Sequence, residues 1–234
     1  MSLLYAARMA RPDLIQTIVS ISRHSADWTK FADSRLEYLM GYVKGSVELE
    51  QKSFVAVGAA KNMYLETFVD ADLGGDESSS RSTSGGLCRL VDDSTSSSMI
   101  VDFWSKRQTA TAKSTTGAEL VSLGHGIDNH AVPLVELLEA IVNRSVRSVF
   151  QEDNMAALLI AKRGYSPAMR MLARHFRCCV ASLGEFFSHK ENELVYCPTA
   201  EQRADPLTKG LTALAMEAAL RLMGMVMPSS TTST

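Results

Sequence analysis

The chain has 234 residues, 46% of them hydrophobic, which is enough to bury the core of one large domain. Its 26 acidic and 24 basic side chains leave a formal net charge of −2, so bulk charge gives no support to nucleic-acid binding. No apolar run reaches the ~20 residues of a membrane span. Residues 1–10 lack the long apolar core of a signal peptide, so none is expected there. No C-x-x-C pair occurs, so we expect every cysteine to be reduced and structural, as in an intracellular protein: Cys88, Cys178, Cys179 and Cys197.

Two apolar stripes at helical spacing occupy the beginning of the chain. The first follows Pro12, a residue that suits the first turn of a helix. The second follows Asp27, which is expected to act as an N-cap, and ends at Gly45, which is expected to stop the helix. We therefore predict a helical hairpin in residues 1–50 and a connector over residues 51–63.

The remaining chain alternates strand-like and helix-like patterns. In chain order we expect strands over 65–69, 85–91 and 99–105, helices over 116–129 and after Pro133, a strand over 146–151, helices over 155–161 and 167–183, a strand over 194–197 and a helix over 213–223. This order is typical of an α/β domain, placed at 64–227, whose mixed sheet begins with a meander and is flanked by helices. The Ser/Thr-rich tail over 228–234 is expected to be disordered.

One segment near the end of the chain is the most informative. Tyr196 to Lys209 reads Y-C-P-T-A-E-Q-R-A-D-P-L-T-K. It resembles Y-V-P-T-x-x-Q-x-A-D-x-L-T-K, which closes the ribonuclease H domain of copia-type retrotransposon polyproteins. Three further motifs of that family, S-D-A-D-W-A-G, S-S-T-E-A-E-Y and C-D-N, resemble the segments around Asp70, Glu119 and Asp153, in the same order.

The resemblance implies a ribonuclease H-like fold, with a three-strand antiparallel meander plus two parallel strands. It also implies metal-dependent cleavage of the RNA strand of an RNA–DNA hybrid during reverse transcription. The resemblance implies four catalytic carboxylates, those of Asp70, Glu119, Asp153 and Asp205. The same four side chains would bind Mg²⁺, or Mn²⁺ as its substitute. Two-metal phosphodiester hydrolysis needs a few oxygen ligands and no thiolate or imidazole, and this set provides that chemistry.

Each carboxylate also has a simpler interpretation. Asp70 and Asp205 could be ordinary acids at element ends. Thr116 and Glu119 have the spacing of a capping box, so Glu119 could serve only to cap its helix. Glu152, next to Asp153, is expected to point to the opposite face as a surface acid.

Several polar and basic residues are candidates for contacts with the nucleic-acid backbone. R-S-T-S-G at 81–85 and W-S-K-R-Q at 104–108 resemble the family's R-K-S-T-S-G and W-S-S-K-K-Q, and residues 154–184 contain basic side chains but no acid. A solvated helix face is the alternative for the basic stretch. The candidates are Asn154, Ser82, Ser84, Lys106, Arg170, Arg174 and Arg177.

Residues 1–50 resemble the tail of the copia reverse transcriptase, through R-P-D-L at 11–14 and Y-L-M-G-Y-V-K-G-S at 38–46. The expected partners are thus an RNA–DNA hybrid and the missing body of that polymerase, with no membrane. An intracellular site is expected, with a cytoplasmic particle and the nucleus both left open. Two rival hypotheses remain: a decayed, inactive relic, and a nucleic-acid-binding module that keeps the fold without turnover.

Overall fold

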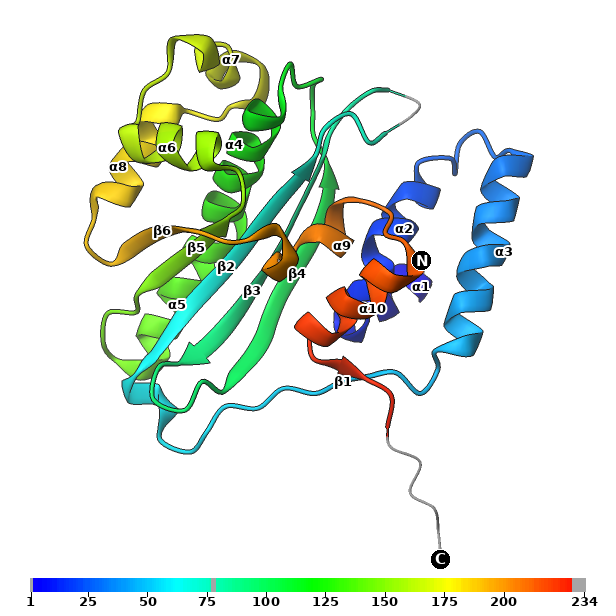
Figure 1. The fold of residues 1–234 in the computed structure, drawn as a ribbon, viewed down its shortest axis with the longest axis horizontal. Helices are drawn as coiled ribbons and strands as arrows, with labels where there is room; N and C mark the ends of the chain where they lie inside the picture. Colours follow the sequence, from blue (N-terminus) through cyan, green and yellow to red (C-terminus); the bar gives the residue numbers. More distant parts are fainter. Residues whose placement is uncertain (1, 77–78, 229–234) are drawn as a thin grey trace, which may run out of the picture.

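The computed structural model describes residues 2–76 and 79–228, and its centre is a five-stranded mixed sheet (Figure 1). The strands are β2 (Met63–Asp72), β3 (Thr83–Asp92), β4 (Ser98–Arg107), β5 (Ser148–Glu152) and β6 (Asn192–Tyr196). They lie in the order β4-β3-β2-β5-β6. The first three form an antiparallel meander, and β5 and β6 run parallel to β2. The predicted α/β class, with three antiparallel and two parallel strands, is confirmed.

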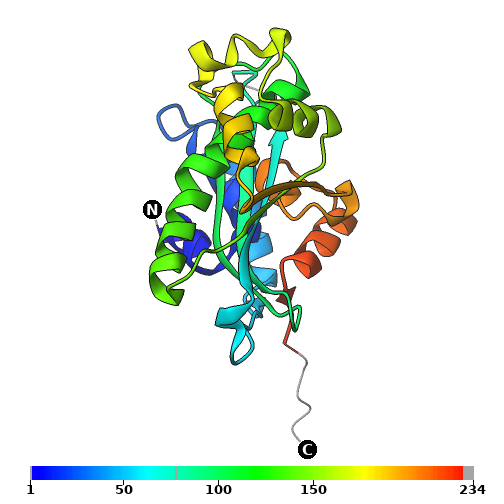
Figure 2. The same ribbon diagram turned by 90° about the vertical axis from the view of Figure 1, so that its left-hand side faces the viewer.

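Helices cover both faces of the sheet (Figures 1 and 2). One face packs against α4 (Thr115–Gly126), α5 (Val132–Val142), α6 (Met155–Arg163), α7 (Leu172–Phe176) and α8 (Val180–Ser188), with a π-helical stretch, Ile127–Ala131, joining α4 to α5. The other face packs against α1 (Ser2–Ala10), α2 (Pro12–Ser22), α3 (Lys30–Gly45), α9 (Asp205–Thr208) and α10 (Ala213–Leu222). Because side chains alternate along a strand, β2 sends Leu65 and Val69 into the first core and Phe68 into the second.

The N-terminal hairpin is built largely as expected. Its second helix begins later than predicted, because Thr29 rather than Asp27 is the N-cap and accepts a hydrogen bond of 3.2 Å from Ala32 N. The buried carboxylate of Asp13 joins the helices: Arg11 Nη2 lies 2.7 Å from its Oδ2 and Tyr42 Oη donates to the same oxygen at 2.9 Å. The helices share a core with the sheet, so they are packed against it.

Further short elements were not expected from the sequence. They are α1, the two-residue strands β1 (Glu50–Gln51) and β7 (Met225–Val226), and the 3-10 turns Ala59–Lys61, Pro167–Met169 and Thr199–Glu201. The antiparallel pair β1–β7 ties the segment after the hairpin to the end of the described chain. The division into a 1–50 remnant, a 51–63 connector and a 64–227 domain stays a prediction. Of the tail predicted over 228–234, all but Pro228 lies outside the described residues.

The single helix predicted over 167–183 is wrong. The segment is divided into a 3-10 turn, α7 and α8. Arg177 adopts φ 57°, a left-handed conformation that ends α7, and the buried Cys178 then donates its thiol to Leu120 O at 3.3 Å. This tertiary contact overrides the helical pattern. No helix within the described residues is long and apolar enough to cross a membrane.

Candidate metal centre

Asp70 and Asp153 are brought together by the parallel pairing of β2 and β5. Phe68 pairs with Gln151 in this register, so Asp70 and Asp153 both follow two residues later at the same end of the sheet. Parallel strands present their carboxyl ends at one edge, and this is where binding sites of α/β proteins commonly form.

Asp205 reaches the same place from the first position of α9, a helix that lies against β2 and β3. The buried side chain of Gln202 anchors the approach, since its Nε2 donates to Val69 O at 2.9 Å and its Oε1 accepts from Ala204 N at 3.2 Å. Gly85 on β3 permits the close approach, because a Cβ there would lie 2.6 Å from Thr208 Cγ2.

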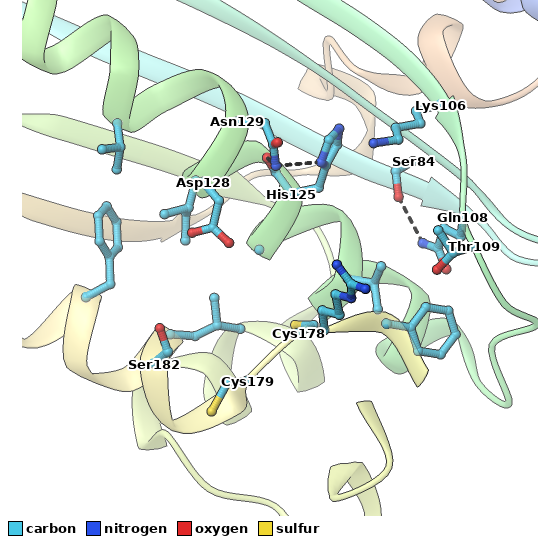
Figure 3. Close-up of a pocket in the computed structure, with 18 of the residues that line it drawn as sticks. Ser84, Lys106, Gln108, Thr109, His125, Asp128, Asn129, Cys178, Cys179 and Ser182 are labelled. Atoms are coloured by element: carbon cyan, nitrogen blue, oxygen red, sulfur yellow. Dashed lines mark hydrogen bonds between the residues drawn. The ribbon is translucent and has the colours of Figure 1, made fainter. Parts of the chain in front are cut away.

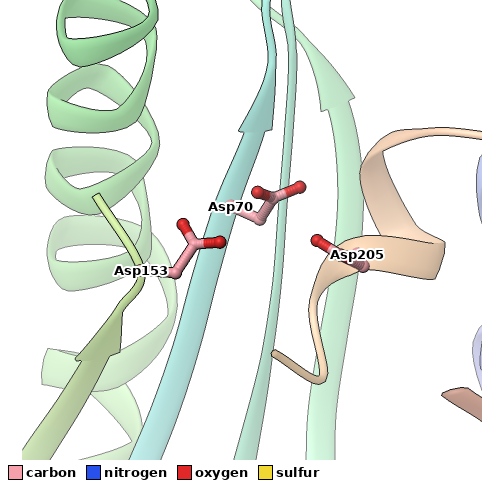
Figure 4. A group of neighbouring side chains, drawn as sticks. All are labelled: Asp70, Asp153 and Asp205. Atoms are coloured by element: carbon pink, nitrogen blue, oxygen red, sulfur yellow. The ribbon is translucent and has the colours of Figure 1, made fainter. Parts of the chain in front are cut away.

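The carboxylates of Asp70, Asp153 and Asp205 converge, with one oxygen of each within 4.8 Å of the others (Figure 4). They come from β2, from the loop after β5 and from α9. A cleft of about 430 Å³ opens beside them, and its lining includes Asp70, Asp153, Glu119 and Lys209. Three acids that are far apart in the sequence therefore lie together in the structure.

Two further motif residues, which the sequence analysis did not single out, hold these acids in place. Thr208 donates its hydroxyl to Asp70 Oδ2 and also lies 3.1 Å from Asp205 O. Thr199 donates to Asp153 Oδ2 at 3.0 Å. Both belong to the segment that resembles the copia motif, so their presence there was the signal available in the sequence.

Glu119 lies on α4 and does not cap it. Ser114 is the N-cap and accepts from Gly117 N at 3.1 Å, so the capping-box interpretation of Glu119 is wrong. The side chain of Glu119 is buried, and one of its oxygens comes within 4.8 Å of oxygens of Glu152 and Asp153. Ser122, one turn along, fixes α4 to β2 by donating to Asp70 O at 2.8 Å.

Glu152 is the site residue that the sequence analysis missed. The expectation of a surface acid is wrong, because its side chain is 0% exposed and faces Glu119 and Asp153. Its backbone ends β5, and its Oε1 accepts from Asn154 N at 3.0 Å. The signal in the sequence was a carboxylate at the place where the family motif has Cys.

Lys209 supplies the positive charge nearest to the three aspartates. Its Nζ lies 2.8 Å from Asp205 Oδ1 and 3.7 Å from Asp70 Oδ2. Burial raises the pKa of Asp70 to about 6, although Lys209 and Thr208 both act in the opposite direction. Burial also raises the pKa of Asp205. One lysine therefore does not compensate for the cost of burying these carboxylates.

Glu119 and Glu152 form a buried acidic pair behind the cleft. Burial raises the pKa of each, and the neighbouring carboxylate raises that of Glu119 further. Oε2 of each side chain is buried without a hydrogen-bond partner among the described residues. Buried polar atoms normally have a hydrogen-bond partner. These two oxygens are therefore free to carry a proton or to bind a cation.

The donor set fits a hard divalent cation. All the converging atoms are carboxylate oxygens, the ligands that Mg²⁺ prefers, and they are held by strand ends and short hydrogen bonds. The buried oxygens without partners add capacity for positive charge. A cation at this position would also remove the repulsion between the acids.

The candidates for nucleic-acid contact are placed unequally. Ser82 is fully buried and accepts from Gly74 N at 3.3 Å, so its role is structural. Ser84 is buried as well and accepts from Gln108 Nε2 at 2.9 Å. Asn154 caps α6 by accepting from Ala157 N at 3.0 Å, yet it also lines the carboxylate cleft. The remaining candidates, Lys106, Arg170, Arg174 and Arg177, are exposed.

A separate cavity of about 480 Å³ lies between β4, α4 and the α7–α8 segment (Figure 3). Lys106, Arg107 and Arg177 line it together with Asp128, so its charge is mainly positive. Burial lowers the pKa of His125 in this cavity to about 4, which leaves that ring neutral at ordinary pH. Figure 3 shows the ring hydrogen-bonded to Asn129. Arg177 belongs both to this cavity and to the exposed basic stretch of residues 170–177, which is called the basic surface below.

If this basic surface grips phosphates, replacing Arg170, Arg174 and Arg177 together with Ala should weaken binding to an RNA–DNA hybrid and flatten its salt dependence. Each lost contact is expected to reduce the log–log salt slope by about 0.7–0.9. Titrations at several salt concentrations without divalent metal would measure this, with the exposed Lys190→Ala as control. An unchanged slope would show that the stretch is only a solvated face.

No protein-family model matches the sequence. Among solved structures, the chain is similar to the N-terminal RNase H domain of a Mycobacterium tuberculosis protein, with 14% identity, a TM-score of 0.40, and coverage of 68% of this chain and 97% of that one. It is also similar to LC11-RNase H1 in complex with an RNA/DNA hybrid, with 14% identity, a TM-score of 0.40, and coverage of 62% and 93%. A third is the prototype foamy virus protease–reverse transcriptase, with 13% identity, a TM-score of 0.36, and coverage of 75% of this chain and 23% of that one. These similarities are too distant to assign an activity, which has to be argued from the side chains.

Proposed function

We propose that this chain is a ribonuclease of the ribonuclease H type, which hydrolyses the RNA strand of RNA–DNA hybrids with the help of divalent metal ions. The observation that carries the proposal is the convergence of Asp70, Asp153 and Asp205, with Glu119 lining the same cleft. These are the four acids that the resemblance to copia-type polyproteins marks as catalytic. The resemblance and the geometry therefore point to the same acids.

In this proposal Asp70, Asp153 and Asp205 hold the metal, and Glu119 completes its surroundings from α4. Bound Mg²⁺, or Mn²⁺ in its place, would supply an activated water and a counter-charge for the phosphoryl oxygens. The protein's own contribution is placement: Thr208 and Gln202 fix the aspartates relative to β2, and Lys209 adds a positive charge beside them. Preorganised groups of this kind need no rearrangement during the reaction.

The substrate class follows from the exposed arginines of residues 170–177. Exposed Arg170, Arg174 and Arg177 offer contacts to phosphates, and such contacts carry no sequence information. Recognition of the RNA strand would then depend on 2′-hydroxyls and on helix shape.

We further propose that the chain derives from a copia-type retrotransposon. Residues 1–50 would be the tail of its reverse transcriptase, and the body of that polymerase would be a natural partner.

Incubation of the purified chain with a labelled RNA–DNA hybrid, with and without Mg²⁺, tests the proposal. We expect cleavage of the RNA strand only when the metal is present, and none of a DNA duplex. Retardation of the hybrid without cleavage would instead identify a binding module. Neither cleavage nor retardation would identify an inactive relic and would contradict the proposal.

A further inference from the structure

A second cleft, of about 400 Å³, lies between the N-terminal helices and the carboxylate cleft. Side chains of α2 and α3 line one side, and the end of β2 and Gly210 line the other. Asp72 lines both clefts, and Gly210 directly follows Lys209 of the metal centre. Helix α2 packs against α9, the short helix that carries Asp205 (Figure 1). The two clefts therefore share Asp72 as a lining residue.

The second cleft contains an aromatic ring with cationic neighbours. The ring of Phe31 is 52% exposed, although it lies beside packed helices. Arg35 places its guanidinium carbon 5.6 Å from the centre of that ring, and the ring of His24 meets it edge-on at 6.4 Å. An exposed aromatic face combined with an arginine is the arrangement on which the bases of single-stranded nucleic acids stack.

One of the two acids that line the second cleft, Asp76, is paired with arginines. Asp76 lies 2.9 Å from Arg107 Nη1 and 3.7 Å from Arg23 Nη1, so two cations from different parts of the chain neutralise it. Arg35 has no such carboxylate partner among the described ion pairs, so its charge is available.

We propose that the second cleft binds an unpaired stretch of the nucleic-acid strand that continues from the cleaved region, with a base stacked on Phe31 and a phosphate at Arg35. The inference rests on the proposed function, because it takes the carboxylate cleft as the place of phosphodiester cleavage. A base can stack on a side chain only when it is free of its own strand's stacking and pairing, so the occupant is single-stranded. The N-terminal hairpin then becomes part of substrate recognition.

The test compares a blunt RNA–DNA hybrid with the same hybrid carrying a single-stranded extension at one end or the other. Fluorescence anisotropy without divalent metal gives the dissociation constants while cleavage is prevented. The wild-type chain should bind one of the extended hybrids about tenfold more tightly than the blunt one. Phe31→Ala should remove this preference and leave binding of the blunt hybrid unchanged. Arg35→Gln should lower the salt slope for the extended hybrid by about 0.7.

Tyr38→Ala is the matched control, since this aromatic lies on the same helix, is 81% exposed and does not line the second cleft. It should keep the preference for the extended hybrid. Thermal unfolding of each variant checks the fold, and Phe31→Leu replaces Phe31→Ala if the latter fails to fold. Equal binding of blunt and extended hybrids by the wild type, or a preference that survives in both Phe31 and Arg35 variants, would overturn the inference. Cleavage of the blunt hybrid with Mg²⁺ tests the proposed function separately.

Discussion

Replacement of Asp70 with Asn is expected to abolish cleavage of the hybrid while the chain remains folded. Asn keeps the size of the side chain and an oxygen that can accept from Thr208, but it lacks the negative charge that holds a divalent cation. Metal ions contribute several kcal/mol to such reactions, so the rate should fall by roughly 1,000-fold or more. Cleavage assays under saturating Mg²⁺ would measure the loss of activity, and titration calorimetry with Mg²⁺ would measure the loss of metal binding.

The expected stability change separates this result from simple unfolding. Asp70 is almost fully buried beside Asp205 and Asp153, and its pKa is raised, so its charge destabilises the metal-free fold. The Asn variant should therefore unfold at the same or a slightly higher denaturant concentration in EDTA. Asp27→Asn, at an exposed position far from the site in sequence, is the matched control and should retain full activity. Substantial cleavage by the Asp70→Asn chain would refute the assignment of the metal centre.

Much of the site was predictable because its residues lie in motifs with a physical task. The motif Y-C-P-T-A-E-Q-R-A-D-P-L-T-K contains Asp205 together with Thr199, Gln202 and Thr208, whose hydrogen bonds fix the aspartates. The strand pattern of β2 and β5 was clear, and their parallel pairing then aligned Asp70 with Asp153. The resemblance supplied the order of the acids, and the fold supplied their proximity.

Other features depend on tertiary contacts that a local pattern does not encode. Glu152 is the last residue of β5, and alternation places its side chain on the same face as Phe150. That face is covered by α4, so Glu152 is buried beside Glu119 and is not at the surface. The helix predicted over 167–183 is interrupted because Cys178 is drawn to Leu120 O. Ser82 looked available to a ligand, but its hydroxyl accepts from Gly74 N inside the loop after β2. In each case a tertiary or loop contact decides where the side chain lies, and the periodicity of the sequence does not reveal such a contact.

The free energy of unfolding of the metal-free chain is expected to fall as pH rises from about 4 to about 6. The pKa of Asp70 is about 6 in the fold against an ordinary value of 3.8, so in this range the folded chain binds more protons than the unfolded one. The contribution of Asp70 to stability is therefore greatest below its ordinary pKa of 3.8 and is lost above its folded pKa of about 6. The shift corresponds to roughly 3 kcal/mol. Denaturant titrations in EDTA across this range would measure it, and the Asp70→Asn chain should show a smaller decrease.

The acidic pair behind the cleft extends the same argument to metal binding. Burial raises the pKa of both Glu119 and Glu152, so at neutral pH at least one proton stays on the pair until a cation arrives. Binding of Mg²⁺ should therefore release protons and become tighter as pH rises. Calorimetry in buffers with different ionisation enthalpies counts the protons that are released.

Glu152→Gln should lower the number of released protons by about one. It should not reduce metal-free stability at neutral pH, because the amide resembles the protonated acid. The exposed Glu37→Gln serves as control, and an unchanged proton count in Glu152→Gln would show that this buried acid is not coupled to the metal.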